Sequence, residues 1–292
     1  MNCTSTEYYG GTALYNADEK LVTWIRYAGF FSNVTVMMHY LCDLKLQGHY
    51  PDKISTWLTE YKNLNIYDGI FYIDKNKIED WKTLDAERVR RFRHGTGVNL
   101  YGFGTSKVQI DIGVVKCLMS AYFNVASNVL TRATELQQGA SIDVSADTFT
   151  WWRKTDKVNE ITWYRHDAKY PSVEQLWGII GQDSRVHLQT DDIDVYNYFE
   201  DKHNVCRLNI LPIGHDKKSG FHVETKDISP EKFTEIYGKD FYEYTTNLVA
   251  LTVVASRCLK FVGYPGNISM FVCLLRGGFD NVVFFKDDRD FF

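Results

Sequence analysis

The segment from Phe149 to Val158, FTWWRKTDKV, decides the fold class that the rest of the sequence must fit. An apolar, β-rich run ends here in a dense group of cations, a hydroxyl and a carboxylate. This change of polarity is expected where a parallel strand ends, because open α/β sheets bind ligands at the carboxyl ends of their strands. Arg153, Lys154 and Lys157 are cations, and an Arg fork matches phosphate geometry. The segment predicts a strand and a phosphate-gripping loop; the alternative is a solvated charged turn.

The carboxyl half of the sequence alternates strands and helices. Apolar runs predict strands at 148–152, 185–189, 206–211, 259–263 and 281–285. Helices are predicted at 172–180, at 194–200, from 229 to a break at 238, at 242–257 and at 268–275. Ser172 and Gln175 match a capping box, and Pro230 suits the first position of a helix. Strands separated by helices in this way indicate a doubly wound parallel sheet, which helices cover on both faces.

The amino half is less regular. It predicts a helix at 35–46 after a loop at 29–33, a strand-like run at 69–73, and one or two helices within 114–135. The small and polar residues at 137–141 mark a candidate boundary. The chain of 292 residues is long enough for two domains of about 100 to 200 residues each. We therefore expect two α/β domains, 1–140 and 141–292, that face each other across a cleft.

Composition excludes several functional classes. A net charge of −4 argues against general nucleic-acid binding, which needs a broad basic footprint. The basic run from Arg88 to His94 is interpreted as a solvated helix face, with an anionic acceptor site as the alternative.

Apolar runs fall short of the ~20 residues that span a bilayer, and no signal-peptide pattern opens the sequence. Six cysteines without CxxC spacing predict buried free thiols. The expectation is a cytoplasmic protein without membrane insertion.

Three segments carry a family resemblance. Residues 153–158, RKTDKV, resemble the Arg-Arg-Thr-Asp-Lys motif of the α1,6-fucosyltransferases, which include the eukaryotic N-glycan core enzyme and the rhizobial NodZ enzymes. Residues 187–192, HLQTDD, are similar to the strand of that family that ends in Thr-Asp-Asp. Residues 261–269, FVGYPGNIS, match less closely a strand, a Ser-Ser pair and a helix. The resemblance spans about 145–275 and implies a GT-B-like fold of two Rossmann-like domains, with the acceptor expected on the amino-terminal one.

The resemblance implies an inverting, metal-independent glycosyltransferase. It would move a sugar, foremost fucose from GDP-fucose, from a nucleotide-diphospho-sugar donor to a hydroxyl of a glycan acceptor, without a cofactor. Arg153 would grip the β-phosphate and stabilise the departing diphosphate. Glu160 would be the general base, and Lys157 would keep it ionised. Glu160 lies three residues after Lys157, whereas the family has this Glu four residues after its Lys.

Other residues are expected to bind the donor. Lys154 replaces the second Arg of the motif, and Trp151 replaces a His that seats guanine, so another donor base, or xylose or a different deoxyhexose as the sugar, stays open. Asp191 suits a ribose hydroxyl or a base edge. Asp192 and Asp194 also match the DxD metal motif, but Asp194 is expected to cap a helix, and no metal is predicted. The full set of expected donor contacts is Arg153, Lys154, Asp156, Trp151, Asp191, Asp192, Gly266, Asn267, Ser269 and Asn33.

Two other classes of protein remain open. A nonenzymatic protein that binds carbohydrate or nucleotide could keep this scaffold without catalysis, and the offset of Glu160 permits it. An unrelated Rossmann-like nucleotide enzyme, such as a phosphoryl transferase, would need a phosphate loop after its first strand, and no Walker or GxGxxG pattern is present. The absence of secretory domains from the sequence suggests a microbial or viral enzyme that acts in the cytoplasm, in the host cytoplasm if it is viral.

Overall fold

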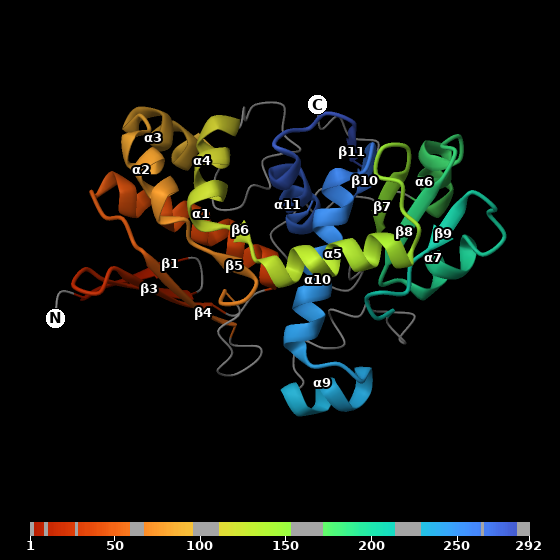
Figure 1. Ribbon diagram of the computed structural model, residues 1–292, viewed down its shortest axis with the longest axis horizontal. Helices are drawn as coiled ribbons and strands as arrows, with labels where there is room; N and C mark the ends of the chain where they lie inside the picture. The colour runs from red at the N-terminus through yellow and green to blue at the C-terminus, as the bar shows by residue number, and fades with distance from the viewer. Residues whose placement is uncertain are drawn as a thin grey trace.

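The fold is α/β, with a parallel sheet in the carboxyl half and a mixed sheet in the amino half (Figure 1). The computed structural model describes residues 3–8, 11–26, 29–58, 67–95, 111–152, 172–213, 229–263 and 266–284. The two sheets lie toward opposite ends of the molecule, with helices between them. Among the described helices, none is both long enough and apolar enough to cross a membrane.

The parallel sheet has the strand order β11-β10-β7-β8-β9. Its strands are β7 (Thr148–Trp152), β8 (Val186–Thr190), β9 (Val205–Arg207), β10 (Lys260–Gly263) and β11 (Val282–Phe284). The chain enters at the central strand β7, runs outward to β9, and then returns to β10 on the other side of β7. This is the order of a doubly wound sheet, and its topological switch point lies between β7 and β10. All five predicted strands are present, although β9 ends four residues earlier than expected.

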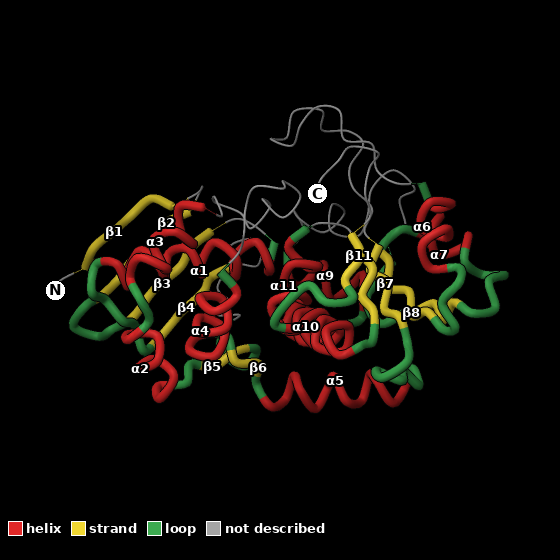
Figure 2. The backbone as a smooth tube through the Cα atoms, turned by 90° about the horizontal axis from the view of Figure 1, so that it is seen from above, coloured by secondary structure: helices red, strands yellow, loops and turns green. Residues whose placement is uncertain are grey.

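Helices cover both faces of this sheet, as predicted (Figure 2). The helices of one face are α6 (Val173–Ile180) and α7 (Ile193–Tyr198); those of the other are α10 (Phe241–Arg257) and α11 (Asn267–Arg276). The expected capping box at Ser172 and Gln175 starts α6. Ser229 caps α9 (Pro230–Tyr237), which ends at Gly238 with φ +66°, a left-handed conformation that glycine adopts without steric cost.

Alternation along the strands separates two apolar clusters. Leu188 and Val262 point to the face of α6 and α7, where they join Leu176 and Phe199 in one cluster. Phe149 and the other residues of the opposite face belong to a larger cluster that includes α10 and α11. Because α10 packs against α11 on one side and α5 (Ser127–Gly139) on the other, it is apolar around most of its circumference.

The amino-half sheet is mixed, so the expectation of a second Rossmann-like sheet is wrong. Its order follows the chain: β1 (Cys3–Tyr8), β2 (Gly11–Asn16), β3 (Leu21–Arg26) and β4 (Lys53–Leu58). The first three strands are antiparallel, and only β3 and β4 are parallel, joined through α1 (Phe30–Leu46). The physical reason is the turn at 17–20, because four residues can join antiparallel strands but cannot cross over to a parallel one.

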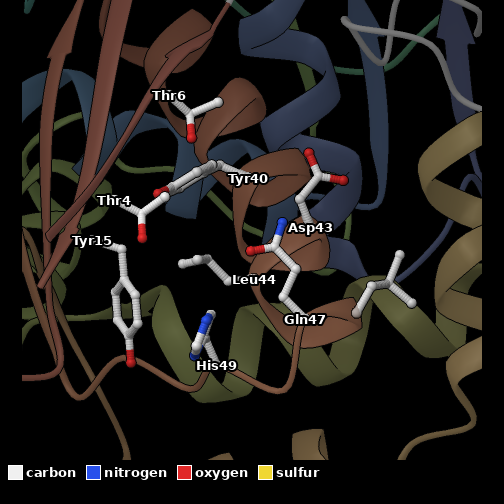
Figure 3. Close-up of a pocket in the computed structure, with 9 residues that line it drawn as sticks. Thr4, Thr6, Tyr15, Tyr40, Asp43, Leu44, Gln47 and His49 are labelled. Atoms are coloured by element: carbon white, nitrogen blue, oxygen red, sulfur yellow. The ribbon is translucent and has the colours of Figure 1, made fainter. Parts of the chain in front are cut away.

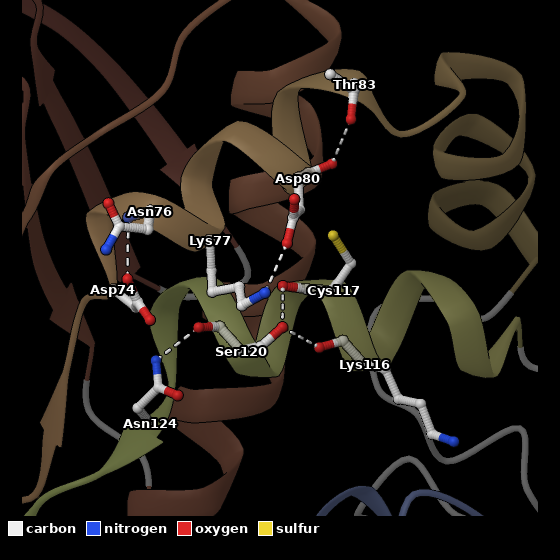
Figure 4. A network of polar contacts seen from close by, with 9 residues as sticks. All are labelled: Asp74, Asn76, Lys77, Asp80, Thr83, Lys116, Cys117, Ser120 and Asn124. Atoms are coloured by element: carbon white, nitrogen blue, oxygen red, sulfur yellow. Dashed lines mark hydrogen bonds and ion pairs between the residues drawn. The ribbon is translucent and has the colours of Figure 1, made fainter.

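Short elements complete the amino half. They are β5 (Phe71–Tyr72), α2 (Lys75–Thr83), α3 (Ala86–Gly95), α4 (Ile112–Tyr122) and β6 (Asn124–Val125). The region predicted as one or two helices thus forms two, α4 and α5, with β6 between them. Polar contacts at the surface stabilise these elements locally: within α2, Lys77 pairs with Asp80 at 3.0 Å, and at the end of α4 the Asn124 amide donates to Ser120 O at 2.6 Å (Figure 4).

One apolar core joins both halves. It runs from the amino-half sheet through α1 and α4 to α10, α11 and the parallel sheet. The rings of Phe31 in α1 and Phe271 in α11 have centroids 4.8 Å apart. Helix α5 lies on the amino side of the boundary expected at 140, yet it packs on α10 in the carboxyl half. The amino half therefore packs directly against α10 and α11, the helices that cover one face of the parallel sheet.

Candidate functional site

Three of the segments singled out in the sequence leave the parallel sheet at its carboxyl edge, which is the side where its strands end. Strands β10, β7 and β8 are neighbours, and their register pairs Gly263 with Trp151 and Trp151 with Gln189. Their carboxyl ends are therefore level. The chain that follows β7, the Asp191-Asp192 pair after β8, and the start of α11 after β10 all leave from this edge. It contains the switch point, where doubly wound sheets bind their ligands.

Five expected site residues lie outside the described part of the chain. They are Arg153, Lys154, Asp156, Lys157 and Glu160. Arg153 directly follows Trp152, the last residue of β7. The roles expected of these residues stay predictions, and only their point of departure from the sheet is known.

Trp151 is part of the core at the end of β7. Its side chain is 6 % exposed, and its ring centroid lies 6.0 Å from that of Phe149 on the same face of the sheet. Its cross-strand neighbours at this edge are Gly263 and Gln189. An indole in this position anchors the strand end by burying apolar surface.

Asp192 caps α7. Its carboxylate accepts a hydrogen bond from Asp194 N at 3.0 Å, and its own N–H donates to Thr190 Oγ1 at 3.0 Å. The expectation that Asp194 caps this helix is therefore wrong, because the helix begins one residue earlier, at Ile193. Asp191, half-buried, is the first residue beyond β8. Within the described ranges, no group of three or more His, Cys, Asp and Glu side chains is placed to hold a metal ion.

The start of α11 is a helix N-terminus without a side-chain cap. Gly266 is its N-cap and makes no side-chain capping bond, so no side chain occupies the first N–H groups of this ten-residue helix as a cap. The main-chain N–H groups and the dipole at a helix N-terminus favour an anion there. Ser269 is only 3 % exposed, so it is placed within the helix packing rather than at the open end.

Gly263 allows α11 to approach β10 closely. A Cβ atom at this position would lie 2.7 Å from Ser269 Oγ and 2.8 Å from the ring of Phe261. Only a residue without a side chain fits between them. Glycine at a strand end before a helix is the sequence signal that could have identified this close approach.

Asn267, the first residue of α11, contacts the amino half. Thr35 Oγ1 of α1 lies 3.4 Å from Asn267 Oδ1 and 2.6 Å from the carbonyl oxygen of Phe31. The first half of α1 therefore lies beside the terminus of α11 at the sheet edge. Thr35 was not expected at the site, because nothing in its local sequence points to a contact 232 residues away.

Asn33 holds α1 to the amino-half sheet. Its side chain is 5 % exposed, and its Oδ1 accepts a hydrogen bond from Trp24 Nε1 at 3.1 Å. The loop expected at 29–33 is helical from Phe30 onward, because Gly29 already takes the N-cap position and Asn33 N donates to Gly29 O at 3.0 Å. Residues 30–33 are therefore the first turn of α1, and the expectation of a loop over them is wrong.

Gln189 was missed as a candidate. It is 1 % exposed, and its Nε2 donates to Thr190 O at 3.1 Å. Its Oε1 is buried and has no hydrogen-bond partner in the described structure. A buried acceptor without a partner is costly, and Gln189 is the penultimate residue of β8, so this acceptor lies close to the carboxyl ends of the strands. Three of the five residues of β8 are polar, so its sequence carries no signal that singles out Gln189.

Two other polar clusters have structural roles. His187 Nε2 lies 2.7 Å from Asp147 Oδ2 near the amino end of β8, and burial lowers the pKa of His187 although Asp147 opposes the shift. On α3, Arg88 forms a bidentate pair with Asp111, at 2.9 and 2.7 Å. Arg93 pairs in the same way with Asp43, at 2.8 and 3.0 Å. The basic run is a helix, but Arg88 and Arg93 are paired and Arg93 is only 15 % exposed, so the face is not fully solvated as expected.

Comparison with known proteins adds no family to this description. No family model matches the chain, and no curated protein matches it either. The resemblance to the α1,6-fucosyltransferases therefore depends on the three motif segments and their order.

Proposed function

We propose that this protein is a glycosyltransferase that binds a nucleotide-diphospho-sugar at the carboxyl edge of β10, β7 and β8. The observation that carries the proposal is the convergence of three segments on one switch point. These segments resemble one enzyme family in sequence, they lie more than 100 residues apart from first to last, and each follows a strand of the same edge. The three strands concerned, β10, β7 and β8, are also neighbours in the sheet.

In this proposal, different residues at the carboxyl ends of β10, β7 and β8 bind different parts of the donor. The N–H groups at the start of α11 and the guanidinium of Arg153 hold the diphosphate, and Lys154 adds a point charge. Asp191 accepts from a ribose hydroxyl. Glu160 removes the proton of the acceptor hydroxyl as it attacks the anomeric carbon, the leaving diphosphate departs from the opposite side, and the anomeric configuration inverts.

The donor base is the least defined part of the proposal. Gln189 Oε1 needs a donor, and the exocyclic amine or ring N–H of a base would supply one. Guanine, as in GDP-fucose, is the first candidate. Because Trp151 replaces a polar base contact of the resembling family, a UDP-linked or GDP-linked pentose such as xylose, or another deoxyhexose, is the alternative.

A nonenzymatic nucleotide- or carbohydrate-binding protein is the second candidate. The offset of Glu160 by one residue from its position in the family favours it. Both candidates bind a nucleotide at the same edge, and only transfer distinguishes them. For the enzyme, transfer is expected to persist in excess chelator, because Arg and Lys side chains take the place of a cation; loss that a metal restores would contradict this.

The test of the site is a thermal-shift screen with GDP, UDP, ADP and their sugar derivatives. A ligand that binds only the folded protein raises the melting temperature. Asn267→Asp is the decisive variant: it is nearly isosteric, it favours the helix terminus, and it places a negative charge against the diphosphate. We expect the nucleotide affinity to fall about tenfold or more, equivalent to about 1.4 kcal/mol.

The matched control is Asn281→Asp, the same change just before β11 at the opposite edge of the sheet. It should leave nucleotide binding unchanged. If no nucleotide stabilises the parent protein, or if both variants lose affinity equally, the switch point is not a nucleotide site.

A further inference from the structure

A polar pocket of about 190 Å³ lies in the amino half, between the first two strands and the last turns of α1 (Figure 3). Its floor is formed by Tyr15, Tyr40 and Leu44, which are all buried. Thr4 and Thr6 of β1 form one side of the rim. The end of α1 and the residues after it supply the other side, with Asp43, Gln47 and His49.

The pocket is not built for an anion. Among the residues that the structure describes, those that line the pocket include no Lys or Arg. Its carboxylate, Asp43, is fixed from outside the pocket by the bidentate pair with Arg93, whose side chain is 15 % exposed. The pair neutralises Asp43 and fixes its orientation. A phosphate would find no cation to bind, and an organic cation would compete with Arg93.

The lining offers both hydrogen-bond donors and acceptors. Gln47 supplies an amide, Thr4 and Thr6 supply hydroxyls, and His49 supplies a ring nitrogen of each kind when neutral. Burial, and then the nearby Asp43, raise the pKa of Tyr40 to about 12, so its hydroxyl stays protonated at neutral pH. These groups surround one space in Figure 3.

An aromatic wall accompanies these polar groups. The rings of Tyr15 and His49 have centroids 4.9 Å apart and are tilted by 40°. A neutral sugar ring combines the features that this lining would recognise: hydroxyls that donate and accept, and an apolar C–H face that packs on an aromatic ring. A few polar groups around an apolar floor are typical of a small-molecule site.

We propose that this pocket binds one neutral sugar residue. It is separate from the switch point, because it lies at the carboxyl end of α1 whereas the other end of α1 contacts α11. Thr35, which contacts α11, and Asp43 at the pocket are eight residues apart on α1, which is about 12 Å along the helix. The sugar in the pocket is therefore not the one transferred; resting on the proposed function, it is a unit of the glycan acceptor distant from the reacting hydroxyl.

The test measures binding of neutral methyl glycosides by saturation-transfer NMR, with fucose, glucose, galactose, mannose, xylose and N-acetylglucosamine as the sugars. His49→Ala removes part of the aromatic wall, and Thr4→Phe fills the pocket from an exposed position of β1. The matched controls are His203→Ala and Thr131→Phe, which change exposed residues elsewhere. Circular dichroism and melting temperature confirm the fold of each variant, and Thr4→Phe decides the test if His49→Ala is unstable.

We expect at least one glycoside to bind the parent and both controls, and to lose affinity about tenfold or more in both pocket variants. Binding should persist in saturating GDP. The proposal is overturned if no neutral glycoside binds the parent, if the pocket variants bind as the parent does, or if GDP displaces the sugar. A parent that binds GDP but no glycoside would refute this pocket and leave the proposed function intact.

Discussion

Thr35 of α1 contacts Asn267, the first residue of α11: Thr35 Oγ1 lies 3.4 Å from Asn267 Oδ1. Beside this contact the rings of Phe31 and Phe271 pack with centroids 4.8 Å apart. The amino half therefore fixes the helix terminus that closes one side of the switch point. A nucleotide site at this edge would depend on α1, although α1 belongs to the other half of the sequence.

Gly263→Ala should destabilise the protein. The new Cβ would lie 2.7 Å from Ser269 Oγ and 2.8 Å from the ring of Phe261, so α11 must shift away from β10. Overpacking of this kind costs about 1 to 3 kcal/mol. The measurement is the free energy of unfolding in urea.

Gly139→Ala is the control for that change. A Cβ at Gly139 meets no atom within 4 Å, and Gly139 is the last residue of α5. Alanine there should be neutral or slightly stabilising. If Gly263→Ala unfolds at the same urea concentration as the parent, then α11 does not approach β10 as closely as the structure has it.

His39 should make the protein sensitive to acid. It is fully buried in α1, and neither ring nitrogen has a hydrogen-bond partner in the described structure. Burial, and then Arg93, lower the pKa of His39 from 6.5 to about 4. The unfolded chain therefore binds a proton more readily, so stability is full above about pH 6.5 and falls as the pH drops toward 4. The loss is roughly 3 kcal/mol, since each pH unit is worth about 1.36 kcal/mol.

The variant His39→Phe isolates this effect. Phenylalanine suits the apolar site beside Phe92, whose ring centroid lies 6.0 Å from that of His39. Unfolding free energies of parent and variant are compared between pH 7 and pH 4, so the titration of other groups cancels. The free energy of unfolding of the variant, relative to that of the parent, should rise as the pH falls. A constant difference would mean that His39 does not stay neutral in the folded protein.

The parallel sheet could be predicted because its signals are local. Residues 148–152 form an apolar run that ends in charges, and Ser172 with Gln175 caps the next helix within four residues. The amino-half sheet has signals of another kind. Ala13 and Tyr15 in β2 alternate with less buried residues, a period-two pattern, but the strands also carry Thr, Ser and Glu, which weaken the apolar signal. The pairing of β2 with β3 depends on the turn at 17–20.

The site was predictable only in part, for a similar reason. Strand ends follow from local sequence, so the edge could be placed. The sequence could not show which polar side chains are engaged in contacts within the fold. Asn33 looked available in the sequence, but the indole of Trp24 binds its oxygen. Gln189 looked like an ordinary strand residue, but the fold buries its oxygen without a partner. Both outcomes depend on residues brought together by tertiary packing.

Arg153→Ala should reduce donor affinity and turnover far more than Lys154→Ala. A planar guanidinium can donate two parallel hydrogen bonds to a diphosphate, whereas an ammonium acts as a point charge. Loss of a fixed donor to developing negative charge costs about 10²-fold or more in rate. Initial rates of donor consumption, with donor affinity measured in parallel, make the comparison. Small and equal effects of the two substitutions would indicate a solvated turn after β7.

Glu160→Gln should separate an enzyme from a binding protein. The amide is isosteric with the carboxylate but cannot accept the proton of the acceptor hydroxyl, and the diphosphate is held by other residues. Donor affinity should therefore stay within about twofold of the parent, while transfer falls by about 10² to 10⁴, the usual contribution of a positioned base. Asp167→Asn is the control for a general loss of negative charge from the same stretch of sequence. Transfer by Glu160→Gln at the parent rate would place the base elsewhere. A parent that binds donor but transfers sugar to no acceptor in a broad glycan panel would favour the binding protein, since the offset of Glu160 would then leave the site without a base.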